Sequence, residues 1–296
     1  MENAVTVKSL TKKYQGFTLN NISFQIPKGC IVGFVGENGA GKSTTILSIL
    51  GVIPRDEGEV ELLGHKIRPR KEGTDTFDPS ADESWREQIG VVFDECNFST
   101  VLNVKLISKI MENVYRTWDN DKFLNYIRRF ELPLDKTVKD YSRGMKMKLS
   151  IAVALSHDSR LLILDEATSG LDPVMRDDIL DILLDFMQEE EHSILVSSHI
   201  TSDLEKVADY IVFIHQGQVV FAKPKDELLM QYGIIKCGAA QFDQLDKGEI
   251  ISWRKQDYEW QALVSDRALA MRRYPKAVVT PATIDEIMLM YVKGER

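Results

Sequence analysis

The segment GENGAGKST at residues 36–44 carries the strongest chemical pattern in the sequence. It satisfies the G-x-x-x-x-G-K-[ST] pattern between an apolar run and a segment with helical periodicity. Glycines allow backbone angles that turn successive N–H groups around an anion, and the following helix presents its positive end to the same anion. We therefore expect a phosphate-binding loop. Its predicted contact residues are Gly36, Glu37, Asn38, Gly39, Ala40, Gly41, Lys42, Ser43 and Thr44.

Two side chains of this loop have specific tasks. Lys42 would reach the β- and γ-phosphates of a nucleoside triphosphate, and the Ser43 hydroxyl would ligate magnesium. The alternative is a glycine-rich turn that matches the pattern by chance, which the strand and helix patterns on either side disfavour.

An acid pair, Asp165 and Glu166, follows the apolar run LLIL. Ligand-binding groups of α/β sheets gather where buried strands end, and the backbone turn there lets both side chains reach one pocket. Asp165 would hold magnesium directly or through water, and Glu166 could accept a proton from the attacking water or orient it. Alone, such a pair is usually a strand ending at the surface. Beside a phosphate loop, the catalytic interpretation is favoured.

These residues need a scaffold in which strands and helices alternate. Short runs rich in Val and Ile are typical of strands buried on both faces of a mostly parallel sheet. Segments with helical periodicity lie between them, so the predicted fold class is α/β. The apolar runs are residues 30–36, 161–165, 193–199 and 210–221.

Three regions depart from this alternation. Residues 98–131 read as two or more helices without a strand, which indicates an all-helical insertion. Residues 68–88 are polar and turn-rich, which is typical of a surface loop. From about Asp226, a hairpin pattern at 248–266 and a final helix with Thr283 near its cap predict a small α+β appendage.

Composition limits the possible functions. The 296 residues are 44% hydrophobic, enough for a full core. A formal net charge of −8 disfavours binding to nucleic-acid backbones, which relies on clustered Lys and Arg. Cys30, Cys96 and Cys237 have no metal-type spacing and are interpreted as buried or idle thiols of a reducing cytosol. Because no signal peptide and no run of about 20 apolar residues is visible, we expect a soluble chain.

The sequence resembles an ATP-binding-cassette (ABC) ATPase over residues 1 to about 225, with that family's motifs in their usual order. After the phosphate loop and the helical insertion come YSRGM at the position of the family signature, LLILDE, SGLD as the D-loop, and a histidine. The resemblance implies a P-loop ATPase core with a mostly parallel sheet flanked by helices and an antiparallel β part. It implies a nucleotide-binding domain at residues 1–225, with a helical subdomain at about 95–155, and a C-terminal accessory α+β region at residues 226–296.

The resemblance also implies roles for three further residues. Tyr14 falls where the family carries an aromatic residue that stacks on adenine, although it could merely end a hairpin. His199 would be the switch histidine that steadies the γ-phosphate, and the alternative is a satisfied core histidine. Asp172 would belong to the nucleotide site as part of the D-loop and could also be the N-cap of a helix that starts at Pro173.

Two departures from the family pattern stand out. Asp94, with Glu95 beside it, stands where the family usually has a Gln that touches magnesium and senses the membrane partner. A carboxylate is a good magnesium ligand, so Asp94 could keep this role; a solvated loop acid is an equal alternative. The signature reads Tyr-Ser-Arg-Gly-Met instead of Leu-Ser-Gly-Gly-Gln, but it keeps the Ser142 hydroxyl and the close backbone approach at Gly144. In this family the turn faces the ATP held by the opposite subunit.

By resemblance, the chain is an ATPase that uses ATP and Mg²⁺ and serves a bacterial drug, peptide or antibiotic-resistance exporter. Two subunits, expected to form a homodimer, would enclose two ATP molecules and drive a membrane permease encoded separately. The chain would be cytoplasmic and peripheral at the inner face of the membrane. One alternative is a soluble cassette protein that acts on nucleic acid or ribosomes. The other is a non-hydrolysing nucleotide sensor, which Glu166 and His199 disfavour.

Overall fold

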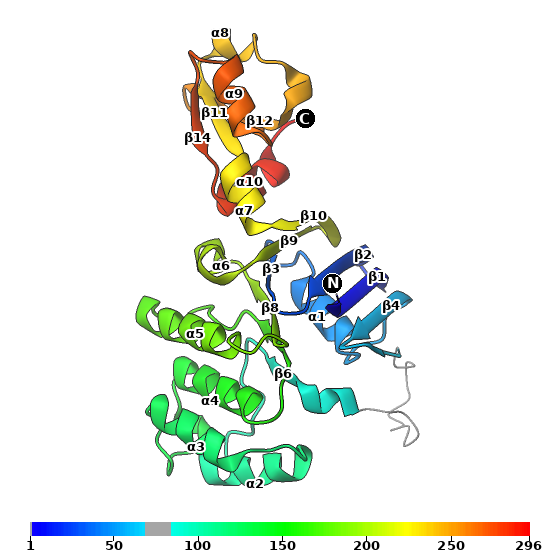
Figure 1. Ribbon diagram of the computed structural model, residues 1–296, viewed down its shortest axis with the longest axis vertical. Helices are drawn as coiled ribbons and strands as arrows, with labels where there is room; N and C mark the ends of the chain where they lie inside the picture. Colours follow the sequence, from blue (N-terminus) through cyan, green and yellow to red (C-terminus); the bar gives the residue numbers. More distant parts are fainter. Residues whose placement is uncertain (1, 69–83) are drawn as a thin grey trace.

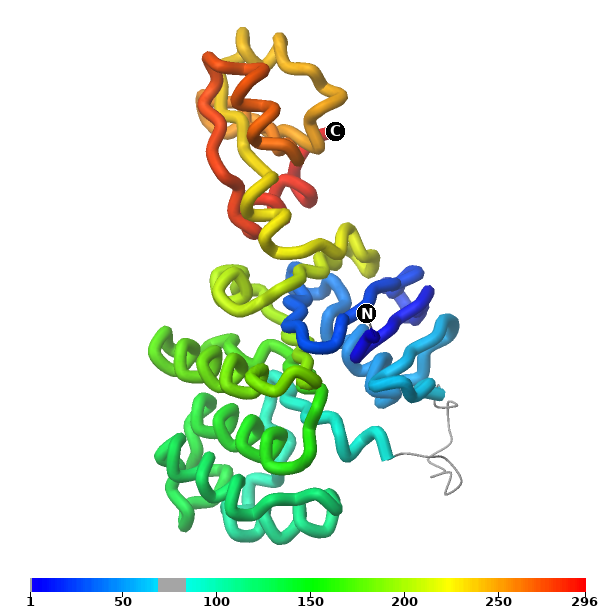
Figure 2. The backbone as a smooth tube through the Cα atoms, viewed as in Figure 1, coloured from blue at the N-terminus to red at the C-terminus, as the bar shows by residue number. Residues whose placement is uncertain are grey.

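The computed structural model describes residues 2–68 and 84–296. Figure 1 shows an elongated molecule with a C-terminal appendage at one end, two sheets in the middle and a group of helices at the other end. The backbone trace in Figure 2 shows the same arrangement, with the N-terminus beside the sheets and the C-terminus in the appendage. In the described residues, no helix is long and apolar enough to cross a membrane.

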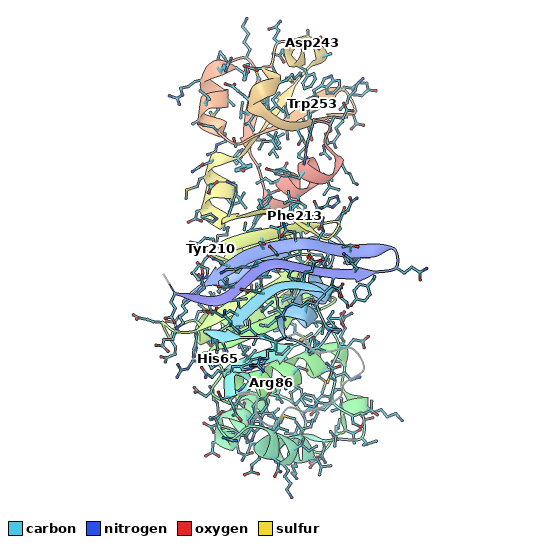
Figure 3. All side chains as sticks on the ribbon, turned by 90° about the vertical axis from the view of Figure 1, so that its right-hand side faces the viewer. His65, Arg86, Tyr210, Phe213, Asp243 and Trp253 are labelled. Carbon is cyan, nitrogen blue, oxygen red and sulfur yellow. The ribbon has the colours of Figure 1, made fainter. Side chains whose placement is uncertain are left out.

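An antiparallel sheet begins the chain, and Figure 3 shows its strands crossing the middle of the molecule. Its strand order is β2-β1-β4-β5. A tight hairpin joins the first two strands and pairs Tyr14 with Phe17. The strands are β1 (Asn3–Tyr14), β2 (Phe17–Pro27), β4 (Glu57–Leu62) and β5 (His65–Lys66).

The central sheet has the strand order β10-β9-β3-β8-β7-β6. All of its neighbouring pairs are parallel except β9 with β10, so the predicted mostly parallel sheet is confirmed. Every residue of β3, β7 and β8 is buried, which explains why these strands are apolar over most of their length. The strands are β3 (Ile31–Val35), β6 (Ile89–Val92), β7 (Leu161–Asp165), β8 (Ser193–Ser198), β9 (Tyr210–His215) and β10 (Gln218–Pro224).

The apolar run at 210–221 is not one strand but the hairpin β9–β10. Gln216 and Gly217 adopt positive φ angles of 45° and 73° and reverse the chain between two apolar halves. A side chain at position 217 would overlap the Thr18 carbonyl oxygen, so the turn packs directly on β2. The Asn20 N–H also donates to the Gly217 carbonyl at 2.8 Å. The hairpin therefore joins the two sheets beside the phosphate loop.

The predicted all-helical insertion is confirmed. Helices α2, α3 and α4 follow one another without a strand, and residues 84–88, expected in a loop, form the short 3-10 helix η1 with Trp85 buried. The rest of the expected loop lies outside the described residues. The helices of the cassette are α1 (Lys42–Ile49), α2 (Val104–Val114), α3 (Asn120–Arg129), α4 (Arg143–Leu155), α5 (Pro173–Phe186) and α6 (Thr201–Val207).

A partly buried polar cluster ties these helices to the sheet. The Glu87 carboxylate accepts hydrogen bonds from the Arg116 and Thr117 N–H groups between α2 and α3, and the Glu87 carbonyl contacts the His157 ring nitrogen at 2.8 Å. His157 stacks on Tyr115 with 3.9 Å between ring centroids. Burial lowers the pKa of His157, so its ring is neutral near pH 7. The helical insertion is therefore held against the strand that leads to Asp94.

The appendage is α+β, as predicted. The expected hairpin is the β12–β13 pair, and the expected final helix is α10, whose N-cap Thr283 forms a capping box with Glu286. The strands follow the order β12-β13-β11-β14. The elements are α7 (Lys225–Gln231), β11 (Gly233–Cys237), α8 (Ala239–Phe242), β12 (Ile250–Gln256), β13 (Glu259–Val264), α9 (Arg267–Arg273), β14 (Val278–Pro281) and α10 (Ile284–Lys293).

The appendage has a small core of its own and also shares the core of the cassette. Its separate cluster includes Phe242, which stacks on Trp260 with 4.2 Å between ring centroids. In contrast, buried residues of α7 and α10, such as Leu228 and Ile287, belong to the same hydrophobic cluster as Phe213 of the central sheet. A cut after residue 225 would therefore expose apolar surface on both sides.

Candidate active site

The phosphate loop connects the buried strand β3 to helix α1. Gly39 and Gly41 have φ angles of +82° and +109°, which residues other than glycine rarely adopt. Gly36 needs to be glycine for a different reason, which is lack of space: an added Cβ would lie 2.5 Å from the Ile214 carbonyl oxygen. The N-cap of α1 is Gly41, which has no side chain, and no other side chain of the described residues caps this end, so the first N–H groups of the helix can bind an anion.

Lys42 lies at the centre of the site. Its side chain is only 6% exposed, and its ammonium donates to the carbonyl oxygens of Gly36 at 2.8 Å and Glu37 at 3.3 Å. The same nitrogen lies 3.2 Å from Glu166 Oε1 and forms an ion pair with it. Lys42 therefore joins the phosphate loop to the acid pair.

Glu166 is held in an unusual backbone conformation at the end of β7. Its φ angle is +54°, a left-handed value that turns the side chain toward the loop. The Glu166 N–H donates to the Ser197 carbonyl and hydroxyl at 3.2 and 3.0 Å, which stabilises this turn. Glu166 Oε2 lies 2.6 Å from the His199 Nδ1 atom. Lys42, Glu166 and His199, which are far apart in the sequence, thus form one connected group.

Asp165 is buried at the same edge of the sheet. The Ser197 hydroxyl donates to Asp165 Oδ1 at 2.5 Å, and no other hydrogen bond to this carboxylate occurs in the described residues. The Ser43 side chain is exposed at the start of α1. A carboxylate and a hydroxyl are ligands suited to Mg²⁺, so Asp165 and Ser43 are the residues that could hold it.

Ser197 is a site residue that the sequence analysis missed. It orients both Asp165 and Glu166, from the neighbouring strand β8. The available signal was the pair of polar residues in the otherwise apolar run SILVSSH, in a strand where every side chain is buried. Buried hydroxyls need hydrogen-bond partners, and carboxylates at the adjacent strand end could supply them.

The signature segment begins helix α4. The Ser142 hydroxyl caps this helix by accepting the Met145 N–H at 3.2 Å, and the side chain is exposed. An added Cβ at Gly144 would overlap the Met175 sulfur of α5, so a larger residue there would require the Met175 side chain to move. The Arg143 guanidinium covers Gly170 of the D-loop, where an added Cβ would lie 2.8 Å from Nη1.

Asp172 and Tyr14 have the local roles that were considered as alternatives. Asp172 is the N-cap of α5, accepting the Met175 N–H at 3.0 Å, with Pro173 in the first turn. Tyr14 ends strand β1 at the hairpin, is 46% exposed, and has the Lys12 ammonium 5.4 Å from its ring centroid. Both side chains remain accessible to a ligand, so neither local role excludes contact with nucleotide.

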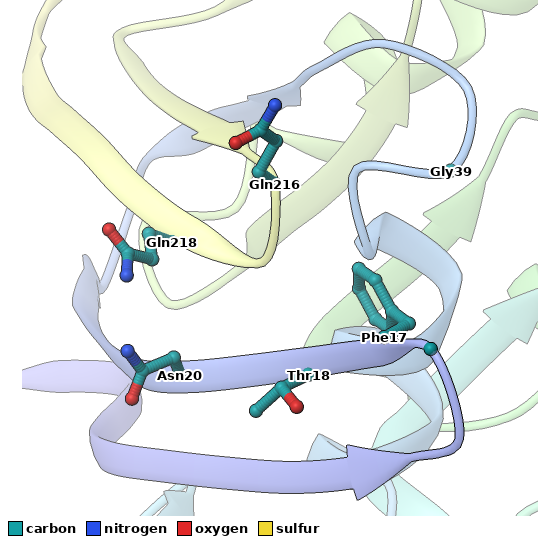
Figure 4. Close-up of a pocket in the computed structure, with 7 residues that line it drawn as sticks. Phe17, Thr18, Asn20, Gly39, Gln216 and Gln218 are labelled. Atoms are coloured by element: carbon teal, nitrogen blue, oxygen red, sulfur yellow. The ribbon is translucent and has the colours of Figure 1, made fainter.

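A cavity of about 460 Å³ lies beside the tip of the phosphate loop. Figure 4 shows Phe17, Thr18 and Asn20 on one side, Gln216 and Gln218 of the β9–β10 hairpin on the other, and Gly39 at the edge. Phe17 also lies close to the loop, since a Cβ at Gly41 would approach its ring to 2.9 Å. Phe17, the hairpin partner of Tyr14, is a further aromatic residue at this side of the loop, and the sequence analysis did not identify it.

Asp94 lies in a different setting from the other site residues. It lines a cavity of about 370 Å³ together with Glu95 and with Arg143, Lys146 and Met147 of α4. The two departures from the family pattern, the acidic residues at 94 and 95 and the arginine at 143, therefore face the same space. Opposite charges placed there attract one another, which gives Asp94 a second available partner besides Mg²⁺.

Asp94 leads to a prediction about magnesium. If it is a ligand, Asp94→Asn should raise the Mg²⁺ concentration required for half-maximal ATP hydrolysis, because a carboxylate holds this cation better than an amide. Asp94→Gln restores the residue typical of the family and should be milder. Magnesium titrations of ATPase activity measure both variants. Unchanged Mg²⁺ dependence in the two variants would leave Asp94 as a solvated loop acid.

A glycine loop after a buried parallel strand, followed by a helix, together with an acid pair on a nearby strand of the same sheet, defines a P-loop nucleotide-binding protein. The family model described as ABC transporter matches residues 19–169. The bacitracin transport ATP-binding protein BcrA of Enterococcus faecalis is 33% identical over 225 residues, covering 74% of this chain and 69% of the relative. The lantibiotic transport ATP-binding protein SrtF of Streptococcus pyogenes is 32% identical over 228 residues, covering 74% of this chain and 90% of the relative.

Solved structures agree with these relatives. A structure described as the ATP-binding subunit of an ABC transporter has a TM-score of 0.65 and 25% identity, covering 76% of this chain and 91% of that one. The cbiO1 protein from Clostridium perfringens, part of the transporter complex cbiONQ, has a TM-score of 0.61 and 25% identity, covering 77% and 91%. The chain belongs to the ABC transporter family. It is the ATP-binding subunit of a transporter and an ATPase.

Proposed function

We propose that this chain is the ATPase subunit of an exporter for peptide-like or antibiotic compounds, acting as a dimer beneath a separate membrane permease. The names of BcrA and SrtF, which refer to bacitracin and lantibiotic transport, support the substrate class. The group formed by Lys42, Glu166 and His199 is the single observation that carries the catalytic part of the proposal. Residues 1–225 form its nucleotide-binding domain and residues 226–296 its accessory region.

Binding of ATP begins with an exchange of partners at Lys42. The phosphates occupy the loop, where the free N–H groups of α1 and the Lys42 ammonium neutralise their charge. Lys42 then turns from Glu166 toward the β- and γ-phosphates. The adenine lies at the Tyr14 side of the loop. Mg²⁺, held by Ser43 and Asp165, supplies charge neutralisation at the phosphate oxygens when bound.

Release of Glu166 from Lys42 makes its carboxylate available as a base. Glu166 Oε1 is buried and has the Lys42 ammonium, at 3.2 Å, as its ionic partner, so once Lys42 turns to the phosphates this oxygen can accept from a water molecule. His199, already in contact with Oε2, orients the carboxylate and reaches the γ-phosphate. The water proton moves to Glu166 as the water oxygen attacks phosphorus and the bond to the β-phosphate oxygen breaks.

The signature segment completes the site of a second subunit. Ser142 and the N-terminus of α4 are exposed and carry the positive end of a helix of 13 residues. In a dimer, these groups of each chain would face the γ-phosphate held by the phosphate loop of the partner. Two identical chains would then enclose two ATP molecules. Closure and reopening then move the permease, which also holds the chain at the inner face of the cell membrane.

Purification from native membranes tests this function. An affinity-tagged chain, solubilised in mild detergent, should co-purify with an integral membrane protein that has several membrane spans, and the complex should hydrolyse ATP. The Lys42→Ala chain should still co-purify but lack hydrolysis, because permease docking does not require the phosphate loop to be filled. Recovery of the native chain with ribosomes, and without a membrane protein, would contradict the proposal.

A further inference from the structure

The C-terminal helix α10 is bonded to the segment that carries His199. The Thr201 hydroxyl donates to Asp285 Oδ1 at 3.1 Å, and the Ile284 N–H donates to Glu205 Oε1 at 2.9 Å. Thr201 is the first residue of α6, two positions after His199. In Figure 1, α10 lies at the end of the appendage nearest to the cassette. The polar bonds thus link the appendage to the start of the switch segment.

Apolar packing holds α10 in the same place. Ile284 and Ile287 are fully buried and belong to one hydrophobic cluster with Leu204 of α6. Farther along α10, the Tyr291 ring centroid lies 5.5 Å from that of Phe221 on β10. Burial raises the pKa of Tyr291 to about 12, so this ring stays neutral and packs as an apolar group. The helix is therefore anchored on the cassette near its start, by Ile284 and Ile287, and near its end, by Tyr291.

The same helix faces the phosphate loop. A cavity of about 310 Å³ is bounded by Gly36, Glu37 and His199 on one side. The α10 residues that bound its other side are Asp285, Glu286, Met288, Leu289 and Val292. The His199 side chain is 42% exposed, and α10 is one of two helices, with α5, that limit where the segment after His199 can move.

Helix α6 depends on such support because its own start is weak. It has only seven residues, and its N-cap, Ile200, provides no side-chain hydrogen bond. The local bonds at this start are long or come from Ser198: the Ile200 N–H donates to the Ser198 hydroxyl at 2.9 Å, the Ser198 hydroxyl to the Ile200 carbonyl at 3.4 Å, and the Asp203 N–H to the Ile200 carbonyl at 3.3 Å. Short helices are marginal without tertiary contacts, and a helix start without a cap frays readily. The Thr201–Asp285 and Glu205–Ile284 bonds are contacts from outside the segment.

We infer that α10 positions His199 for hydrolysis, acting through Thr201 and Asp285, so that the appendage is a working part of the catalytic cassette. This inference rests on the proposed role of His199. Thr201 and Asp285 touch no reacting atom in this scheme and are positioning residues. Their effect is on the orientation of the imidazole that contacts Glu166 at 2.6 Å. Productive geometry requires such groups to be held closely, so a small displacement lowers the rate.

Four substitutions in the full chain test the inference. Thr201→Val and Asp285→Ala remove the hydrogen bond, whereas Thr201→Ser and Asp285→Asn keep a hydroxyl donor and an oxygen acceptor. The first pair should lower kcat by about threefold to tenfold, the size expected for one lost hydrogen bond, with KM for ATP nearly unchanged. The second pair should retain nearly native kcat. Equal, native kcat in all four variants, with only the melting temperature lowered, would overturn the inference.

A second measurement separates this inference from the proposed function. His199→Ala should abolish most hydrolysis, and adding Thr201→Val to it should cause no further loss, because both act through the same imidazole. A further loss in the double variant would mean that Thr201 acts independently of His199, which contradicts the inference. Native hydrolysis in His199→Ala would instead contradict the proposed role of His199 itself.

Discussion

Replacing Glu166 by glutamine is expected to lower ATP hydrolysis by about 10²–10⁴, the usual scale for losing a general base, while ATP still binds. Glutamine has nearly the same shape but cannot take the proton of the attacking water. The structure adds a second effect. Lys42 is paired with Glu166 at 3.2 Å, and the neutral amide removes the charge that competes with the phosphates for Lys42. ATP should therefore bind more tightly to Glu166→Gln than to the native chain.

Two assays check this result, and one variant serves as control. Single-turnover hydrolysis measures the chemical step, and equilibrium binding of ATP measures affinity, with size-exclusion chromatography to detect a dimer trapped by ATP. Lys42→Ala should show the opposite pattern, with weak ATP binding and no trapped dimer. A Glu166→Gln chain that turns over ATP at nearly the native rate would show that another group is the base.

Two variants that are each inactive alone are expected to regain ATPase activity when mixed, if the signature of one chain completes the ATP site of the other. Ser142→Asp is the appropriate signature variant because Asp caps helices as well as Ser, so α4 keeps its N-terminal bond. The new carboxylate would repel the γ-phosphate of the opposite ATP. Gly144→Asp would be less direct, since a side chain there also displaces the Met175 side chain within the same chain.

The expected activities follow from random pairing. Homodimers of Ser142→Asp and of Lys42→Ala should both be inactive. In a mixture, about half of the dimers are heterodimers with one intact site, so roughly a quarter of native activity should return if the sites act independently. Ser142→Asn is the matched control, because it has the size of Asp and keeps the cap without the charge; its activity should exceed that of Ser142→Asp, and the difference measures the effect of the charge.

ATP-dependent dimerisation must be measured in the same mixtures. Sites that require each other could leave hydrolysis low even when heterodimers form around one ATP. Failure of both restored hydrolysis and restored dimerisation, with all variants folded, would show that the signature segment does not serve an opposite subunit. Arg143 and Met145 would then mark a segment without a function in the partner's site.

The chemistry of the phosphate loop and the acid pair could be predicted from sequence because each works through contiguous residues. A loop of closely spaced glycines and a Lys-Ser pair is a local requirement, and so is a carboxylate pair at a strand end. Local signals also predicted the final helix, since its capping box joins Thr283 to Glu286 only three residues away. The same holds for the hairpin of β12 and β13.

The tertiary structure alone decided which distant residues meet. Ser197 contacts Asp165 and Glu166 from another strand, and only the parallel pairing of β7 with β8 brings them together. The turn at Gln216 and Gly217 was missed because an apolar run on both sides is equally compatible with one strand; the packing of Gly217 on Thr18 selects the hairpin.

The contact between the appendage and the switch segment likewise could not be predicted from the sequence. Asp285 and Thr201 are 84 residues apart, and nothing in either local pattern indicates a partner. Their contact follows from burial of the apolar face of α10 against the central core, which leaves the polar start of this helix beside α6. Local sequence specified the groups that do chemistry, because their spacing along the chain is itself the requirement. Long-range burial specified what holds those groups in place, because packing depends on surfaces that form only when the whole chain is folded.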